Sequence, residues 1–195
     1  GLGWLFVAVW GLSKLVFALL LRWRDPTLLV ERATRHENTQ RYDRIIVPVY
    51  SLVSFSTFLV VGIDGGRFHH SLNVPITLLV LAYLLYLLAN VLSGWAVFAN
   101  PYFSAESRLQ SDRDQKVTRT GPYRYIRHPA YLATIILWAV TGILLNSWWA
   151  LVPGVLSAGL ILVRTAFEDR MLHAELPGYA EYARQARFRL FPGVW

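Results

Sequence analysis

The first group of residues that could carry chemistry runs from Val117 to Tyr131, directly before an apolar stretch. Gly121-Pro122 breaks the chain, and Pro129 suits the first position of a helix because its missing N–H would have no partner there. His128 is then expected next to a helix N-terminus and beside Arg127. Free backbone N–H groups, the helix dipole and these side chains would together favour an anionic ligand. The alternative is that Arg127 and His128 only anchor the helix among lipid headgroups.

A second group follows the last long apolar stretch and contains Arg164, Glu168 and Asp169. Arg164 and Glu168 are four residues apart and share a helix face, so an intrahelical ion pair is the simplest interpretation. Acidic groups this close to hydrocarbon, however, need a partner or a ligand. The pattern therefore favours a functional role.

The C-terminal residues form a third group with weaker signals. Tyr179 and Tyr182 are three apart on one short helical face, which by itself is typical of an amphipathic tail. The five histidines do not form a metal set, because His69-His70 is expected on the opposite membrane side from His128 and His173. No histidine pair has the spacing of a helical zinc motif. We therefore predict no metal site.

The composition narrows the class of protein. With 55% hydrophobic and 16% charged residues among 195, and a mean hydropathy of +0.38, the chain is too apolar for an ordinary soluble domain. It contains no cysteine, so thiol chemistry and disulfides are excluded. The net charge of +7 lies in the loops between apolar segments, which indicates membrane topology rather than nucleic-acid binding.

The elements that must position these residues are helices in a bilayer. We predict an all-α, polytopic membrane bundle of about five transmembrane helices with a cytoplasmic C-terminal cofactor-binding region. The five apolar segments are Leu2 to Leu21, Ile45 to Ile63, Val74 to Phe98, Ala130 to Leu145 and Trp148 to Val163. The last two are expected to form a tight hairpin at Asn146-Ser147, whose second arm continues as a polar helix through Glu168.

Charge counts orient the spans. Lys and Arg number six in 22–44, one in 64–73, six in 99–129, none in 146–147 and five in 164–195. This alternation satisfies the positive-inside rule with the N-terminus outside and the C-terminus in the cytoplasm. Residues 22–44 are interpreted as a cytoplasmic connection carrying topology charge, with one short interfacial helix. Lys14, in the middle of the first span, is the exception.

The domain organisation follows from these spans. We expect one membrane domain over 1–195, with three N-terminal spans in 1–99 and a catalytic half in 100–195 that contains the hairpin and the cytoplasmic tail. Because the loop before His128 and the tail after Arg164 fall on the same predicted side, their residues can share a site. The sequence indicates no oligomeric state.

In this order and spacing, the three groups resemble the isoprenylcysteine carboxyl methyltransferase family and its bacterial relatives, which share features with phospholipid N-methyltransferases. The resemblance covers about 103–195. Its most specific parts are Gly121-x-Tyr123-x-x-x-Arg127-His128-Pro129-x-Tyr131 and Arg164-x-x-x-Glu168-Asp169-x-x-Leu172, with Gly178-Tyr179-x-x-Tyr182 trailing. It implies a multi-pass membrane enzyme, of the bacterial inner membrane like its relatives, that binds S-adenosylmethionine at the cytoplasmic face. The implied acceptor is lipophilic and comes from the bilayer, with a carboxylate methylated as in isoprenylcysteine.

The resemblance also implies roles for individual residues. Glu168 would meet the ammonium of the cofactor and Arg164 would orient the acceptor carboxylate, so these two form the expected catalytic pair. Asp169 stands where the family more often has a second Glu. The cofactor contacts implied are Lys116, Val117, Gly121, Tyr123, Arg127, His128, Tyr131, Glu168 and Asp169. The N-terminal half matches no motif and is expected to shape the acceptor pocket.

Three other interpretations remain open. A phospholipid N-methyltransferase would use the same cofactor on an amine. An NAD(P)H-dependent membrane reductase of the sterol type also has an Arg-His pair before a Tyr, but Glu168 and Asp169 would repel dinucleotide phosphates. A small lipid-binding adaptor would use its basic face only to attract anionic lipid.

Overall fold

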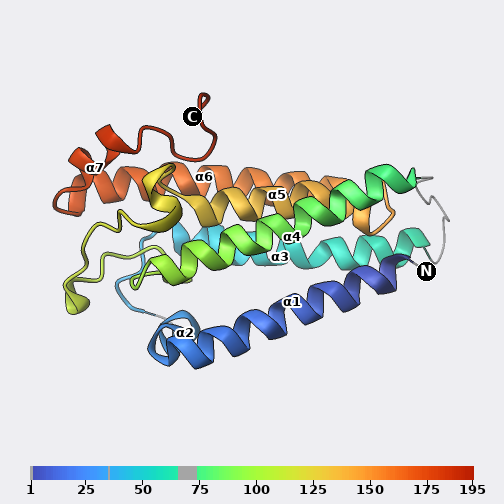
Figure 1. Cartoon of the computed structure of the whole chain (residues 1–195), viewed down its shortest axis with the longest axis horizontal. Helices are drawn as coiled ribbons and strands as arrows, with labels where there is room; N and C mark the ends of the chain where they lie inside the picture. The colour runs from blue at the N-terminus through green and yellow to red at the C-terminus, as the bar shows by residue number, and fades with distance from the viewer. Residues whose placement is uncertain (1, 35, 66–73) are drawn as a thin grey trace.

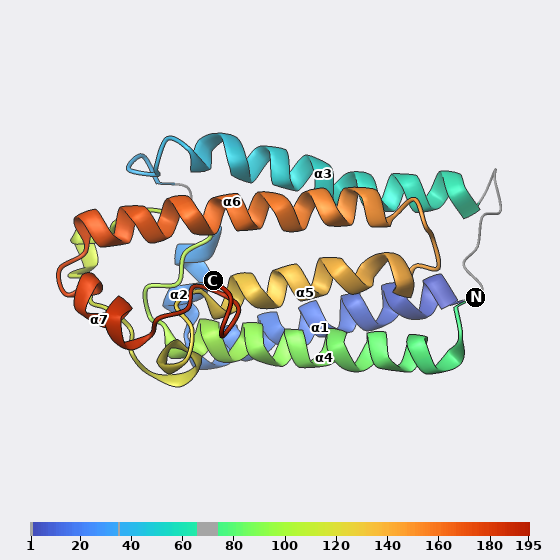
Figure 2. The same cartoon turned by 90° about the horizontal axis from the view of Figure 1, so that it is seen from above.

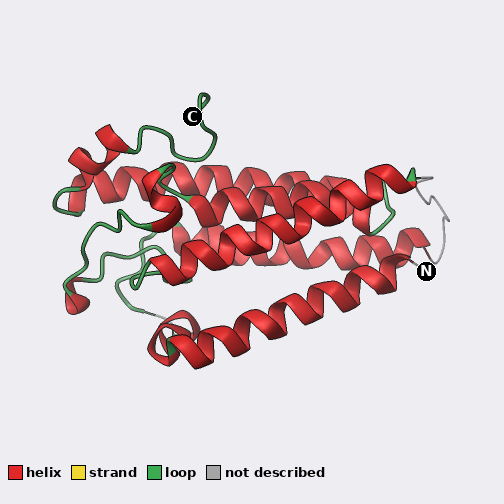
Figure 3. Ribbon diagram, in the orientation of Figure 1, coloured by secondary structure: helices red, strands yellow, loops and turns green. Residues whose placement is uncertain are grey.

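The computed structural model describes residues 2–34, 36–65 and 74–195, and the regular structure in these ranges is helical (Figures 1 and 3). The α-helices are α1 (Leu2–Arg24), α2 (Pro26–Ala33), α3 (Asp43–Ile63), α4 (Ile76–Ala99), α5 (Pro129–Leu144), α6 (Leu151–Glu175) and α7 (Tyr179–Gln185). Two short 3-10 turns, η2 (Ser111–Arg113) and η3 (Gly121–Arg124), lie in the connection between α4 and α5. The prediction of an all-α polytopic bundle is confirmed.

Four of these helices, α1, α3, α4 and α6, are long and apolar enough to cross a membrane. The fifth apolar helix, α5, has 16 residues and is about 24 Å long, less than a typical hydrocarbon core of ~30 Å. Figure 2 shows α5 running alongside α4 and α6, so the chain passes along the bundle five times although α5 falls short of a full span. Leucines and valines remain exposed along α1, α3 and α4, as expected for surfaces solvated by lipid.

The hairpin between α5 and α6 is tight, as predicted. Asn146 adopts a left-handed backbone with φ of 57°, and Ser147 caps the turn by accepting from the N–H of Ala150. Gly154 packs against the backbone of Trp138, where an added Cβ would lie 3.1 Å from the carbonyl oxygen. The second arm continues unbroken through Glu168 to Glu175, which confirms the predicted polar extension.

The predicted short helix in 22–44 is α2. Asp25 caps it by accepting from the N–H of Leu28, and Pro26 occupies its first position. Leu28 packs with Leu21 and Val97, so α2 is tied to the ends of α1 and α4. Residues 66–73, with His69-His70 and the low-charge loop, lie outside the described residues.

One end of the bundle gathers α2, the long connection between α4 and α5, α7 and the C-terminal segment (Figure 1). The buried side chains here include Ala96, Tyr123, Leu176, Tyr179 and Tyr182. The N-terminus of α5 lies at the same end, next to these segments. The expectation that the loop before His128 and the tail after Arg164 share one side of the molecule is confirmed.

Candidate functional site

Backbone pairing between two distant segments fixes the start of α5. Ile126 and Phe188 form an isolated parallel bridge, the N–H of Arg127 donates to the Phe188 carbonyl at 3.0 Å, and the N–H of His128 donates to Arg189 at 2.9 Å. His128 is the N-cap residue and Pro129 begins the helix, as the sequence predicts. The C-terminal segment therefore holds both basic side chains in place.

Gly121 shapes the turn that leads to this strand-like segment. Its φ is +59°, and an added Cβ would lie 2.9 Å from both the Ala99 Cβ and the Trp95 Nε1. Only glycine tolerates both constraints without a shift of α4. The turn presses η3 against α4 and buries Tyr123.

Asp169 is the centre of a buried charge cluster. Arg127 donates to it from Nε at 2.8 Å and from Nη2 at 3.1 Å, and Arg189 donates from Nε at 2.7 Å. The Tyr179 hydroxyl donates at 2.9 Å, and His128 Nε2 lies 3.3 Å away. Because these partners come from the segment before α5, from α7 and from the tail, Asp169 on α6 joins four parts of the chain. The alternative in which Arg127 and His128 merely anchor a helix among lipid headgroups is wrong, since both are buried in this cluster.

Glu168, the preceding residue, points the other way on α6. The hydroxyls of Tyr131 and Ser107 donate to its Oε2 at 2.6 and 2.5 Å, and His128 Nδ1 lies 3.9 Å from Oε1. Its side chain is 20% exposed, whereas that of Asp169 is 1% exposed. His128 thus bridges the two carboxylates, and only Glu168 is open to a ligand.

Arg164 does not pair with Glu168 in the described structure. Its Nε and Nη2 bind the two carboxylate oxygens of Asp43, both at 2.8 Å, and Nη2 also donates to the Ala105 carbonyl at 2.8 Å. Its guanidinium lies 5.3 Å from the centre of the Tyr131 ring. The expected intrahelical pair is therefore wrong, because a buried bidentate partner from α3 satisfies the guanidinium better than an exposed neighbour one turn away.

The segment 22–44 contributes more than topology charge, which corrects the sequence interpretation. Glu31 accepts from the buried Arg108 at 2.7 Å, and Asp43 accepts from the N–H of Ser107 at 2.6 Å as well as from Arg164. Glu106 in turn accepts from the Thr39 hydroxyl at 2.5 Å. The hydrogen bonds and ion pairs of these acidic residues thus hold the segment 22–44 against the loop that follows α4.

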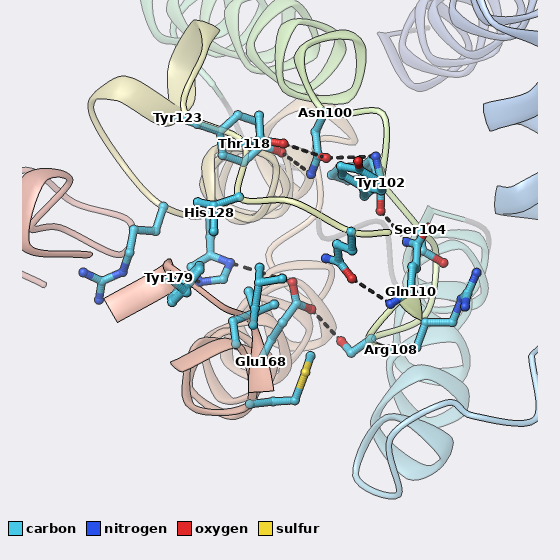
Figure 4. A pocket seen from close by; sticks show the side chains of 18 of the residues that line it. Asn100, Tyr102, Ser104, Arg108, Gln110, Thr118, Tyr123, His128, Glu168 and Tyr179 are labelled. Atoms are coloured by element: carbon cyan, nitrogen blue, oxygen red, sulfur yellow. Dashed lines mark hydrogen bonds and ion pairs between the residues drawn. The ribbon is translucent and has the colours of Figure 1, made fainter. Parts of the chain in front are cut away.

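These groups surround a pocket that is open on one side, and the space between its walls, open solvent included, is about 780 Å³. Figure 4 shows His128, Glu168 and Tyr179 on one side and Arg108, Gln110 and Ser104 on the other. A third side carries Asn100, which accepts from Thr118 at 3.0 Å and contacts the Tyr123 hydroxyl (Figure 4). The pocket is therefore lined by two acidic residues, Glu106 and Glu168, by several aromatic rings and by polar loop residues.

The predicted site residues divide into two sets. The pocket is lined by Lys116, Val117, Tyr123, Arg127, His128, Tyr131 and Glu168. Gly121, Arg164 and Asp169 do not line it: the first shapes the turn and the other two are held in ion pairs beside it.

Other residues at or beside the pocket were missed by sequence reasoning. The sequence gives no signal for Ser107 and Asn100, which are ordinary polar residues in a loop and at a helix end. Asp43 had a weak signal, since it is an acidic residue at the start of an apolar helix. No cluster of three or more His, Asp or Glu in the described ranges could hold a metal ion.

Three buried tyrosines at this end form hydrogen bonds through their hydroxyls: those of Tyr179 and Tyr182 donate, and that of Tyr123 accepts from the Asn100 amide. Burial raises the pKa of Tyr123, Tyr179 and Tyr182 above the usual value, and the neighbouring Asp169 raises the pKa of Tyr179 further. Tyr182 donates to the Tyr123 carbonyl at 2.7 Å. Because these phenols stay protonated at neutral pH, they fix geometry and do not serve as bases.

Comparison with known proteins decides the family. The family model for phospholipid methyltransferase matches residues 76–176, which is more than half of the chain. The chain belongs to the phospholipid methyltransferase family. No curated protein matches it. The more specific resemblance to isoprenylcysteine carboxyl methyltransferases stays a prediction.

The matched region of this phospholipid methyltransferase family member coincides with the part of the fold that builds the pocket. It begins at α4 and ends one residue after α6, so it includes His128, Tyr131 and Glu168. The protein is accordingly a membrane methyltransferase. Asp43 and α7 lie outside the match, although Asp43 contacts Arg164 and α7 supplies Tyr179 to the cluster at Asp169.

Proposed function

We propose that the protein binds S-adenosylmethionine in the pocket at the α5 N-terminus and transfers its methyl group to a lipophilic acceptor from the bilayer. The observation that carries this proposal is the position of Glu168. It is a carboxylate that faces the pocket and accepts from the hydroxyls of Tyr131 and Ser107, while Arg164, one turn away on α6, binds Asp43. Such a group suits a ligand that carries an ammonium.

The rest of the lining also fits this cofactor. Tyr102, Tyr123 and Tyr131 place aromatic rings around the pocket, and such rings attract a cation such as a sulfonium. Met171, Leu172 and Leu176 add an apolar side that suits a purine ring. Lys116 and Arg108 offer cationic partners for a carboxylate, although Arg108 is already paired with Glu31 and Asp112, and Lys116 forms an exposed pair with Asp114.

The chemistry requires little from the protein beyond alignment. Bound S-adenosylmethionine supplies an activated methyl group: its carbon–sulfur bond breaks, sulfur keeps the electron pair, and the acceptor's lone pair forms the new bond to carbon. Tyr131 and His128 orient Glu168 so that it can fix the donor. The loop from Ser104 to Gln110 covers the opposite side and limits the access of water.

The acceptor is either a carboxylate, as in prenylcysteine, or an amine, as in a phospholipid. A carboxylate needs a cation to place it and no base, whereas an ammonium must first lose a proton. Arg164 was expected to hold the carboxylate, yet both oxygens of Asp43 already bind it. This pairing favours an amine acceptor.

Transfer of radiolabelled methyl from S-adenosylmethionine tests the proposal. Detergent-purified protein is mixed with a membrane lipid extract, with phosphatidylethanolamine and with a prenylcysteine analogue in separate reactions. We expect label in a lipid product, and none with Glu168→Gln. Arg164→Lys should keep cofactor binding but lower transfer. Absence of label in every reaction, together with tight binding of reduced nicotinamide dinucleotide, would instead support a reductase.

A further inference from the structure

Ser107 lies in the connection between α4 and α5 and contacts the acid that faces the pocket. Its hydroxyl donates to Glu168 Oε2 at 2.5 Å, and the Tyr131 hydroxyl donates to the same oxygen at 2.6 Å. The other oxygen, Oε1, lies 3.9 Å from His128 Nδ1. Two donors on one oxygen fix the rotation of the carboxylate, so that a ligand meets Glu168 in one orientation.

The direction of the Ser107 hydroxyl depends on how the backbone around it is held. Residues 104–110 contain no helix or strand, and a serine hydroxyl can rotate to suit its surroundings. The N–H of Ser107 donates to Asp43 Oδ2 at 2.6 Å, and its carbonyl accepts from the N–H of Gln40 at 3.0 Å. Both backbone polar groups of Ser107 are therefore bound by residues at or just before the start of α3.

Asp43 is suited to hold this loop because its own position is fixed. It is 1% exposed and begins α3, and Arg164 on α6 binds both of its carboxylate oxygens at 2.8 Å. The preceding residue, Tyr42, stacks on Phe167 with ring centres 5.1 Å apart. The start of α3 is thus tied to the turn of α6 that carries Glu168.

The pair of Asp43 and Arg164 can reach a ligand only through another residue, because neither of the two lines the pocket. Ser107 does line it. The backbone of Ser107 is bound by Asp43, and its side chain binds Glu168. The contacts therefore form a chain from α3 through the loop to the carboxylate that faces the pocket.

Asn38 shows that contact between the same two segments need not lead to the pocket. Its side-chain amide donates to the carbonyl of Leu109 at 3.2 Å, so it also holds the loop that contains Ser107. Leu109, however, does not line the pocket. Of these two links, the one from Asp43 ends on a residue that donates to Glu168.

We infer that Asp43 and Ser107 are positioning residues of the methyl-transfer site. Asp43 fixes the backbone of Ser107, and the Ser107 hydroxyl orients the carboxylate of Glu168 toward the ammonium of the donor. The inference rests on the proposed function for its cofactor readout, and it goes further by giving α3 a part in ligand binding. Because α3 lies outside the matched region 76–176, this control of Glu168 comes from the half of the chain without a family motif.

Calorimetric titration of S-adenosylmethionine into the detergent-purified full chain tests the inference by a double-variant cycle. Ser107→Ala removes a hydrogen bond to a charged acceptor and should weaken binding about tenfold, whereas Ser107→Thr keeps the hydroxyl and should stay within about threefold of the wild type. Asp43→Ala should also weaken binding about tenfold. Because Asp43 acts through Ser107, the variant with both changes should lose about tenfold, not the roughly hundredfold of two independent effects.

Two further variants separate positioning from general loosening and from misfolding. Asn38→Ala is the matched control, since it removes a contact from the same segment to the same loop, and it should change affinity less than about twofold. Asp43→Leu/Arg164→Met removes both charges together and replaces Asp43→Ala if the unpaired Arg164 unfolds that variant. Additive losses in the cycle, or equal losses in Asn38→Ala and Ser107→Ala, would overturn the inference.

A measurement without cofactor distinguishes failure of this inference from failure of the proposed function. The chain contains six glutamates, and the nuclear magnetic resonance signal of the isotope-labelled Glu168 carboxylate is assigned by its loss in Glu168→Gln. In the ligand-free protein this signal should move in the same direction in Ser107→Ala and Asp43→Ala, and stay in place in Asn38→Ala. These shifts in a protein that does not bind S-adenosylmethionine would refute the proposed function and leave the positioning of Glu168 in place. A Glu168 signal that does not move in Asp43→Ala would overturn the inference whether or not the cofactor binds.

Discussion

Replacing Asp169 by Asn should destabilise the fold and loosen the site, because Asp169 is the counter-charge for Arg127 in the interior. The substitution keeps the size of the side chain but removes its charge. Breaking a buried pair by removal of one partner costs about 3–5 kcal/mol. Arg127 also donates to the carbonyls of Ala186 and Arg187, both at 3.1 Å, and the part-exposed Arg189 can turn to solvent. We therefore expect the low end of this range, about 3 kcal/mol.

Unfolding of the purified protein by titration with a denaturing detergent measures this loss. A change of about 3 kcal/mol lowers the ratio of folded to unfolded protein more than a hundredfold. Asp114→Asn is the matched control, since its partner Lys116 lies 3.3 Å away in an exposed pair. Stability of Asp169→Asn within about 0.5 kcal/mol of the wild type would refute the reasoning that Asp169 is structural.

Three further outcomes are expected. Gly121→Ala should destabilise the fold by about 1–3 kcal/mol, since the positive φ and the contacts with α4 leave no room for a Cβ; unchanged unfolding would contradict this. Asp43→Asn should reduce methyl transfer and thermal stability together, because Arg164 loses its bidentate partner; transfer at the wild-type rate would show that the pair has no role. Stability should fall above pH ~10, because tyrosines ionise there in the unfolded chain, whereas the buried Tyr123, Tyr179 and Tyr182, with their raised pKa, stay protonated in the folded protein. Phenolate absorbance should therefore show these three tyrosines ionising only as the protein unfolds.

Much of the fold could be predicted because it depends on local patterns. The lengths of the apolar segments predict the long helices, and Pro129, as a residue suited to the first helical position, predicts that His128 lies at the start of α5. The continuation of α6 through Glu168 followed from its helical spacing. The limited length of α5 also follows from the sequence, since the apolar segment Ala130 to Leu145 has the same length of 16 residues as the helix.

The site was harder to predict because its partners are distant in sequence. Arg164 and Asp43 are separated by 121 residues, and no local pattern joins them. Glu168 and Asp169 are neighbours, yet they are rotated by about 100° on α6 and meet different elements. The resemblance grouped both as cofactor contacts. Packing assigns Glu168 to the pocket and Asp169 to the buried cluster beside it.

The most direct test of the central claim is calorimetric titration of S-adenosylmethionine into the detergent-purified protein and into Glu168→Gln. The account predicts saturable binding to the wild type and a loss of at least tenfold in the variant, since the carboxylate that faces the pocket would no longer be charged. Equal binding to both proteins, or no binding to the wild type, would contradict it.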